Sequence, residues 1–182
     1  MKYHGVLVGL KVIVFDTEEA RKVFSLGFYG KPFGIRKPRS PDFNAPLELS
    51  LIEAVYLVEK GFLEVRNLEG RVLELKELVE YAEKRIPRFN ILYPVYRDLR
   101  EKGYVVRSGL KFGADYAVYE HGPGIDHAPF LVHVMPLNEV IDPIEIVRAG
   151  RLSHSVRKHF VIAAVNPGTG TIKYVMFKWF KP

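Results

Sequence analysis

Short apolar runs alternate along this chain with segments that carry the start and stop signals of helices. Runs such as "GVLVGLKVIVF" (5–15) and "HFVIAAV" (159–165) are rich in β-branched residues, which is typical of strands. Between them, "SLIEAVYLVEKG" (50–61) places Ser50 and Glu53 at capping-box spacing and ends at a glycine. This alternation predicts a mixed α/β fold. Each apolar run is far shorter than the ~20 residues that cross a bilayer, so we expect no membrane segment.

The character of the sequence changes near residue 88. An amphipathic helix is predicted over "LKELVEYAEKRI" (75–86), and Pro87 ends it. We therefore expect an α/β (α+β) protein of two small mixed domains. Residues 1–87 form the N-terminal domain, and residues 88–182 form a C-terminal domain with a central mixed β-sheet flanked by helices.

Two stretches of the first half carry other local signals. "YGKPFGIRKPRSPDFNAP" (29–46) is rich in proline, glycine and cations, which predicts a long loop. The apolar residues of "RVLEL" (71–75) predict a short strand.

The second half contains two predicted helices with explicit end signals. The first follows Asn90, which we expect to be its N-cap, with Pro94 in the first turn. The second has Asp142 as N-cap and Pro143 at the first position, and Gly150 is expected to end it.

The composition excludes several kinds of chemistry. Cysteine is absent, so the chain has no disulfide, no thiol nucleophile and no thiolate metal site. We expect a cytoplasmic protein, and the composition is compatible with a thermophilic source. The basic, apolar N-terminus has Lys11 at its centre and no small-residue cleavage site, unlike a signal peptide. The net charge of +6 favours a polyanionic partner.

Familiar catalytic motifs are missing. The sequence has no phosphate-binding glycine loop followed by lysine, no nucleophile elbow and no HExxH. His121, Asp126, His127 and His133 could bind a metal ion, but their spacing matches no closed site. A metal-dependent nuclease that uses these residues remains an alternative, although we expect no metal ion and no cofactor.

Two polar segments of the second half carry proton-transfer groups. "YEHGPGIDH" (119–127) joins a tyrosine at a strand end to a histidine beyond a Gly/Pro loop. "GRLSHSVRKHF" (150–160) is a basic segment before a strand. Separately, each is typical of a solvated turn. A tyrosine, a histidine and a lysine in one domain of a basic protein can also form a metal-free RNA-cleaving set.

Two stretches of the second half resemble the archaeal tRNA-splicing endonuclease family: "YRDLREKGYVVRSGLKFGADYAVYEHGPGIDHAPFLVHV" and the later "RLSHSVRKHFVIAAV". "LSLIEAVYLVEKGFLEV" resembles it more loosely, so the likeness covers most of the chain. "GLKFGADYAVYE…H" joined to "HSVRK" is its most specific part. The resemblance implies an RNA endonuclease that removes introns from precursor tRNA at bulge–helix–bulge splice sites, without a metal ion.

The resemblance implies a catalytic triad of Tyr119, His127 and Lys158. The family tyrosine falls on Tyr119 and not Tyr116, and the family histidine on His127 and not His121. Tyr119 would accept the proton of the attacking 2′-hydroxyl, His127 would protonate the leaving 5′-oxygen, and Lys158 would stabilise the phosphorane. Because tyrosine has an ordinary pKa near ~10, we expect a cation such as Lys158 to favour its phenolate. The products would be a 2′,3′-cyclic phosphate and a 5′-hydroxyl.

The family also clamps a flipped-out bulge base between arginines. The first arginine corresponds to Arg151, and Arg157 beside the triad lysine is a further candidate for substrate binding. The second lies on the C-terminal strand, where this chain has Lys173. A lysine lacks the planar guanidinium that stacks on a base.

Relatives assemble as tetramers, in which an acidic loop of one subunit inserts into a cationic cleft of another. The corresponding loop here, "VNPGTGTI" (165–172), contains no acid. We therefore expect the catalytic subunit of an α2β2 assembly, with a non-catalytic partner that supplies the acidic loop, and self-association through the C-terminal strand. The N-terminal domain would serve assembly and possible RNA contact. The alternatives are a self-sufficient homotetramer and a non-catalytic RNA-binding or assembly subunit.

Overall fold

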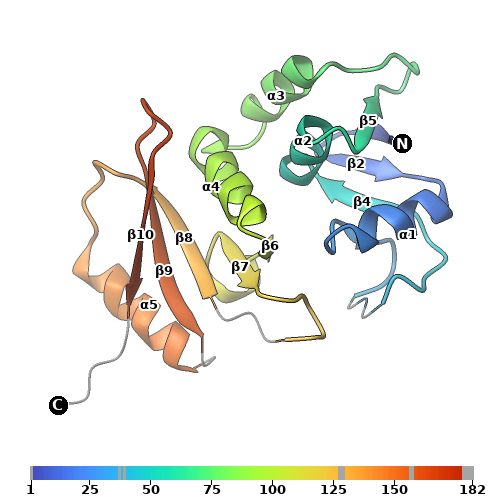
Figure 1. Ribbon diagram of the computed structural model, residues 1–182. Helices are drawn as coiled ribbons and strands as arrows, with labels where there is room; N and C mark the ends of the chain where they lie inside the picture. Colours follow the sequence, from blue (N-terminus) through green and yellow to red (C-terminus); the bar gives the residue numbers. More distant parts are fainter. Residues whose placement is uncertain (1, 37, 39, 127–129, 156–157, 178–182) are drawn as a thin grey trace. The chain divides into compact units, whose positions relative to one another are not determined.

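The computed structural model describes residues 2–36, 38, 40–126, 130–155 and 158–177, apart from the side chains of 152–155 (Figure 1). The chain divides into two compact units, Met1–Phe89 and Asn90–Pro182. The sequence prediction placed the domain boundary between residues 87 and 88. Each unit contains a five-stranded mixed sheet, so the predicted mixed α/β class is confirmed.

The sheet of the N-terminal unit has the strand order β3-β4-β2-β1-β5. Its strands are β1 (Tyr3–Val8), β2 (Lys11–Val14), β3 (Lys31–Pro32), β4 (Leu47–Ser50) and β5 (Leu63–Arg66), and its helices are α1 (Thr17–Ser25), α2 (Leu51–Glu59) and α3 (Leu75–Glu83). β1 pairs in parallel with β5, and the other pairs are antiparallel. The core lies between this sheet and the helices, with side chains such as Phe24 and Leu57 almost fully buried.

The predicted capping box of α2 is confirmed, and its carboxylate also holds the preceding loop. Glu53 Oε2 accepts hydrogen bonds from the Ser50 N–H at 2.9 Å and the Ser50 hydroxyl at 2.8 Å. Ser50 Oγ accepts the Glu53 N–H at 3.2 Å. Glu53 Oε1 accepts the Gly30 N–H at 2.9 Å. A buried carboxylate is stable here because backbone donors surround it.

One prediction for this unit was wrong, and one strand was not predicted. The predicted loop over 29–46 contains only the two-residue strand β3 in its described part, and β4 follows it directly. β4 was not predicted because residues 47–50 pair along β2 in a register that local composition does not reveal. The segment 71–75 is not a strand. It forms one bridge, between Arg66 and Val72, and Glu74 then becomes the N-cap of α3.

The sheet of the C-terminal unit has the order β10-β9-β8-β7-β6. Its elements are α4 (Phe89–Glu101), β6 (Val105–Ser108), the 3₁₀ helix η1 (Leu110–Phe112), β7 (Tyr116–Tyr119), β8 (Phe130–Pro136), α5 (Pro143–Ser155), β9 (His159–Val165) and β10 (Ile172–Phe177). Only β8 and β9 pair in parallel, and α5 lies in the crossover between them.

The two faces of this sheet carry different helices. On one face, the Tyr116 hydroxyl donates to the Leu92 carbonyl of α4 at 2.8 Å, and the Tyr174 hydroxyl donates to Asp98 Oδ2 at 2.5 Å. Tyr116 is therefore a buried packing residue, as expected. The other face carries α5, which packs on β9 (Figure 1). The core cluster on that face consists of Ala114, Ala117, Leu131, Met135, Ala149, Phe160 and Ile162.

Both predicted helices of this unit exist with different ends. α4 begins at Phe89, so Asn90 and Pro94 lie inside it and Asn90 is not its N-cap. α5 begins as predicted, with Pro143 first and Asp142 Oδ1 accepting the Ile144 N–H at 2.8 Å. It continues through Gly150 to Ser155, because a glycine inside a helix costs only ~1 kcal/mol relative to alanine. None of the helices in the described part of the chain combines the length and apolar character needed to span a bilayer.

Candidate functional site

Three strand ends of the C-terminal unit meet at one end of its sheet. β7 runs antiparallel to β8 with Val118 opposite Phe130, and β8 runs parallel to β9 with Phe130 opposite His159. Tyr119 is the last residue of β7, and Lys158 immediately precedes β9. The fold therefore brings these two predicted site residues to the same sheet end. His127, three residues before β8 in the sequence, lies outside the described residues, as does Arg157.

Tyr119 is partly buried against the core cluster beneath α5. Burial raises the pKa of its hydroxyl above the ordinary value. The nearby Arg107 guanidinium opposes this rise in pKa, and the Asp126 carboxylate adds to it. In the free protein Arg107 is a cation that favours the phenolate, and its effect on this pKa does not outweigh that of burial. The expectation that Lys158 favours the phenolate stays a prediction.

Lys158 lies beside an aromatic ring of η1. Its Nζ is 5.2 Å from the centroid of the Phe112 ring, within the range of a cation–π contact. Partial burial lowers the pKa of its ammonium, the neighbouring Lys111 lowers it further, and Asp126 opposes both effects. Lys158 is thus a cation in a partly desolvated, positively charged environment.

Asp126 closes the loop that follows Tyr119. Its Oδ2 accepts the N–H groups of Glu120 and His121 at 3.0 and 3.2 Å, and its Oδ1 accepts the Gly122 N–H at 2.8 Å. Slight burial raises the pKa of this carboxyl, but the three N–H donors outweigh burial and lower it overall. Asp126 is therefore an anion that influences both Tyr119 and Lys158.

The histidines considered as metal ligands have other neighbours. His133 Nδ1 lies 3.3 Å from Asp115 Oδ2, and this carboxylate also accepts the Val134 N–H at 2.7 Å. His133 is therefore a satisfied strand residue, as expected. Within the described ranges, no three His, Asp or Glu side chains gather as metal ligands would.

The predicted clamp residues Arg151 and Lys173 lie on different elements of the C-terminal unit. Arg151 is exposed on α5. Lys173 on β10 is exposed and pairs with Ala164, near the far end of β9. Six residues of strand separate Ala164 from Lys158, which corresponds to about 20 Å. The fold does not bring Lys173 to Lys158 within one chain.

Sequence reasoning missed Arg107, Lys111 and Phe112 as neighbours of the site, and it considered Asp126 only as a metal ligand. The available signals were the motif "KFGAD", which begins with Lys111 and Phe112, and the position of Asp126 directly before His127. Arg107 carried no local signal. It reaches the site because β6 pairs with β7.

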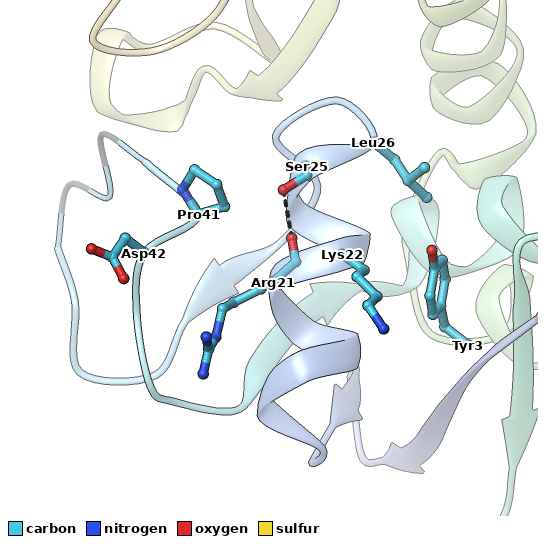
Figure 2. A pocket seen from close by; sticks show the side chains of 7 residues that line it. All are labelled: Tyr3, Arg21, Lys22, Ser25, Leu26, Pro41 and Asp42. Carbon is cyan, nitrogen blue, oxygen red and sulfur yellow. Dashed lines mark hydrogen bonds between the residues drawn. The ribbon is translucent and has the colours of Figure 1, made fainter.

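The N-terminal unit has a hollow of its own, with a volume of about 490 Å³. Figure 2 shows the side chains that line it: Arg21, Lys22 and Ser25 from α1, Leu26 directly after α1, Tyr3 from β1, and Pro41 and Asp42 from the long loop. No described atom bonds to Arg21 Nε. The hollow is shallow, mixes two cations with a carboxylate, and contains none of the predicted site residues.

Sequence comparison matches both units to domains of one family. Residues 89–174 match the domain described as "tRNA intron endonuclease, catalytic C-terminal domain". Residues 3–79 match "tRNA intron endonuclease, N-terminal domain". The catalytic-domain match therefore includes Tyr119 and Lys158.

Full-length relatives carry a consistent name. The tRNA-splicing endonuclease of Hyperthermus butylicus is 58% identical over 178 residues, which cover 98% of this chain and 98% of the relative. The tRNA-splicing endonuclease of Saccharolobus solfataricus is 52% identical, covering 97% of this chain and 98% of the relative. That of Saccharolobus islandicus is 51% identical with the same coverage.

Proposed function

Because this chain belongs to the tRNA-splicing endonuclease family, and is thus an endonuclease that cleaves tRNA introns, we propose that it cuts RNA without a metal ion. In this mechanism the 2′-hydroxyl attacks the adjacent phosphorus and the bond to the 5′-oxygen breaks. The products are a 2′,3′-cyclic phosphate and a 5′-hydroxyl, because no water enters the step.

Three residues would carry the proton transfers and the charge. Tyr119 accepts the proton of the 2′-hydroxyl, His127 donates a proton to the leaving 5′-oxygen, and Lys158 stabilises the negative charge on the phosphorane. The single observation that carries this proposal is the meeting of the ends of β7, β8 and β9 at one end of the sheet. That topology supports a shared site for groups from three separate segments.

The raised pKa of Tyr119 sets a condition on this mechanism. A phenol that stays protonated is a poor general base, so Tyr119 needs a neighbouring cation in the RNA complex. Arg107 already has the required effect on the pKa. We infer that Arg107 assists Tyr119, while Lys158 acts on the phosphorane.

A cleavage assay with excess EDTA, on this chain combined with its proposed partner subunit, tests the mechanism. The substrate is a bulge–helix–bulge precursor RNA, and the readout is the chemical nature of both new ends. We expect Tyr119→Phe and Lys158→Ala to reduce cleavage at least 100-fold, while Lys84→Ala on the exposed surface leaves it unchanged. Cleavage that requires a divalent ion would support the histidine-based metal nuclease instead. Wild-type rates in both triad variants would favour a non-catalytic subunit.

The same proposal includes the assembly. We propose an α2β2 tetramer in which a partner subunit supplies the acidic loop that this chain lacks. The turn before β10 supports this view, because Asn166 Oδ1 accepts the Gly168 and Thr169 N–H groups and the turn carries no carboxylate.

Self-association would use β10, the edge strand of the sheet. Val175 is 51% exposed and Met176 is 42% exposed, which is compatible with strand pairing between subunits. Light scattering of the purified chain should give a dimer that is inactive alone and active with the partner. An active tetramer of this chain alone would support the homotetramer.

A further inference from the structure

A groove of about 500 Å³ lies next to the candidate site, between η1, β8 and α5. Its wall on the site side is Phe112, the ring against which Lys158 lies. Its floor is the apolar surface formed by Met135, Ile146, Ala149, Phe160 and Ile162. Since Phe160 follows Lys158 by two residues, the groove starts about 7 Å along β9 from the catalytic lysine.

Two ammonium groups share the Phe112 ring at the mouth of this groove. Lys111 Nζ lies 5.4 Å from the ring centroid and Lys158 Nζ lies 5.2 Å from it. Two cations held near one ring repel each other. Burial lowers the pKa of Lys158 most, and the repulsion from Lys111 lowers it further. Lys111 forms no ion pair with any described residue. An anion between the two lysines would remove this repulsion.

Three carboxylates also line the groove. They belong to Glu139 and Asp142, before α5, and to Glu145 in its first turn. Asp142 caps the helix and Glu145 pairs with Arg148 at 3.1 Å, so both are engaged. Glu139 has no ion pair within the described part of the chain. Its carboxylate can accept hydrogen bonds from a neutral ligand with N–H or O–H groups.

This arrangement suits a ligand with an anionic end and a flat, partly apolar body that carries hydrogen-bond donors. We propose that the groove binds one nucleotide of the RNA substrate next to the cleaved bond, with its phosphate between Lys111 and Lys158 and its base on Phe112. Aromatic side chains bind bases of any sequence by stacking, so this subsite holds the strand without reading its sequence. The proposal rests on the function proposed above.

The first test separates binding from chemistry. With Lys111→Gln we expect KM for the precursor RNA to rise about tenfold with little change in kcat, because the lost contact exists before the transition state. The slope of log KM against log salt should fall by about one. The falling alkaline limb of the pH profile should move to higher pH, since Lys111 lowers the pKa of Lys158. Lys102→Gln, an exposed lysine paired with Asp98, is the matched control.

The second test locates the nucleotide directly. A precursor RNA with 4-thiouridine next to the cleaved phosphate is bound to the active enzyme and irradiated. We expect crosslinks in peptides that contain Phe112 or Met135. No crosslink in these peptides, together with an unchanged KM in Lys111→Gln, would overturn the subsite.

Three outcomes distinguish failure of the subsite from failure of the proposed mechanism. If Lys111→Gln weakened subunit assembly and not RNA binding, the groove would hold a protein segment and the proposal would be wrong. If Tyr119→Phe and Lys158→Ala kept full activity, the mechanism would fail whatever the crosslinks show. Loss of activity in those two variants, together with an unchanged KM in Lys111→Gln and no crosslink, would overturn the subsite alone.

Discussion

Replacing Asp126 by asparagine should impair cleavage and shift its pH dependence in a predictable direction. Asparagine keeps the size of the side chain but has one carbonyl oxygen. This oxygen can accept either the two N–H groups that bond to Oδ2 or the one that bonds to Oδ1. The amide NH₂ then faces the remaining N–H donors and cannot accept from them. Each hydrogen bond to a charged group contributes roughly 1.5 to 3 kcal/mol, and we take the lower end for this exposed loop.

The expected loss follows from the number of bonds. One or two lost bonds weaken the closed loop by about 1.5 to 3 kcal/mol, and ~1.4 kcal/mol corresponds to a tenfold change in rate. Since this loop leads from Tyr119 directly to His127, we expect kcat to fall roughly 10- to 100-fold.

The pH dependence of cleavage gives a second prediction, the direction in which the limbs of the profile should move. Asp126 raises the pKa of both Tyr119 and Lys158, so losing its charge lowers both. Among the described residues, Arg107 beside Tyr119 and Lys111 beside Lys158 remain and act in the lowering direction. The rising limb that reports the phenolate and the falling limb that reports the ammonium should therefore both move to lower pH.

The assay is single-turnover cleavage of precursor RNA across a pH series, with tyrosinate absorbance as a second readout. Asp16→Asn is the control, because the Asp16 carboxylate also accepts two backbone N–H bonds, from Glu18 and Glu19 at 2.9 and 2.8 Å. A fall in rate with unshifted limbs would show that Asp126 only supports the loop. Limbs that move to higher pH would refute the electrostatic reasoning.

Other predictions follow from the same structure. Gly109→Ala should lower the free energy of unfolding by about 1 to 3 kcal/mol in thermal melts, because a Cβ there would lie 2.7 Å from the Tyr116 carbonyl carbon. Gly150→Ala should raise it by roughly 0.5 to 1 kcal/mol, since a Cβ inside α5 meets nothing within 4 Å; destabilisation would contradict the continuous helix. Glu53→Gln should cost about 2 to 4 kcal/mol in urea denaturation, as acceptors for Gly30 or Ser50 are lost; a neutral result would contradict this.

Local signals predicted the parts of the fold that depend on local chemistry. Ser50 and Glu53 start a helix wherever the chain places them, and Asp142 with Pro143 does the same. The C-terminal ends of the helices were less predictable. Gly150 is a typical terminator, yet α5 passes through it, because further helical residues compensate the small cost of one glycine. β4 was missed because it exists through its pairing with β2.

At the candidate site too, local motifs were predictable from the sequence and tertiary neighbours were not. The sequence singled out Tyr119 and Lys158 through motifs that are contiguous along the chain. It could not place Arg107 beside Tyr119, since that proximity follows from the pairing of β6 with β7. Nor could the sequence show that burial of Tyr119 affects its pKa more than Arg107 does, because this burial depends on the core beneath α5.

The parallel pairing of β8 with β9 has a consequence for protein synthesis. Parallel neighbours require a crossover, so Lys158 reaches the sheet end of Tyr119 only after α5 and β9 have been made. A nascent chain on the ribosome that stops before residue 158 has the tyrosine strand but lacks the lysine. With Lys158 in its proposed role, the chain could not cleave RNA until α5 and β9 have been translated.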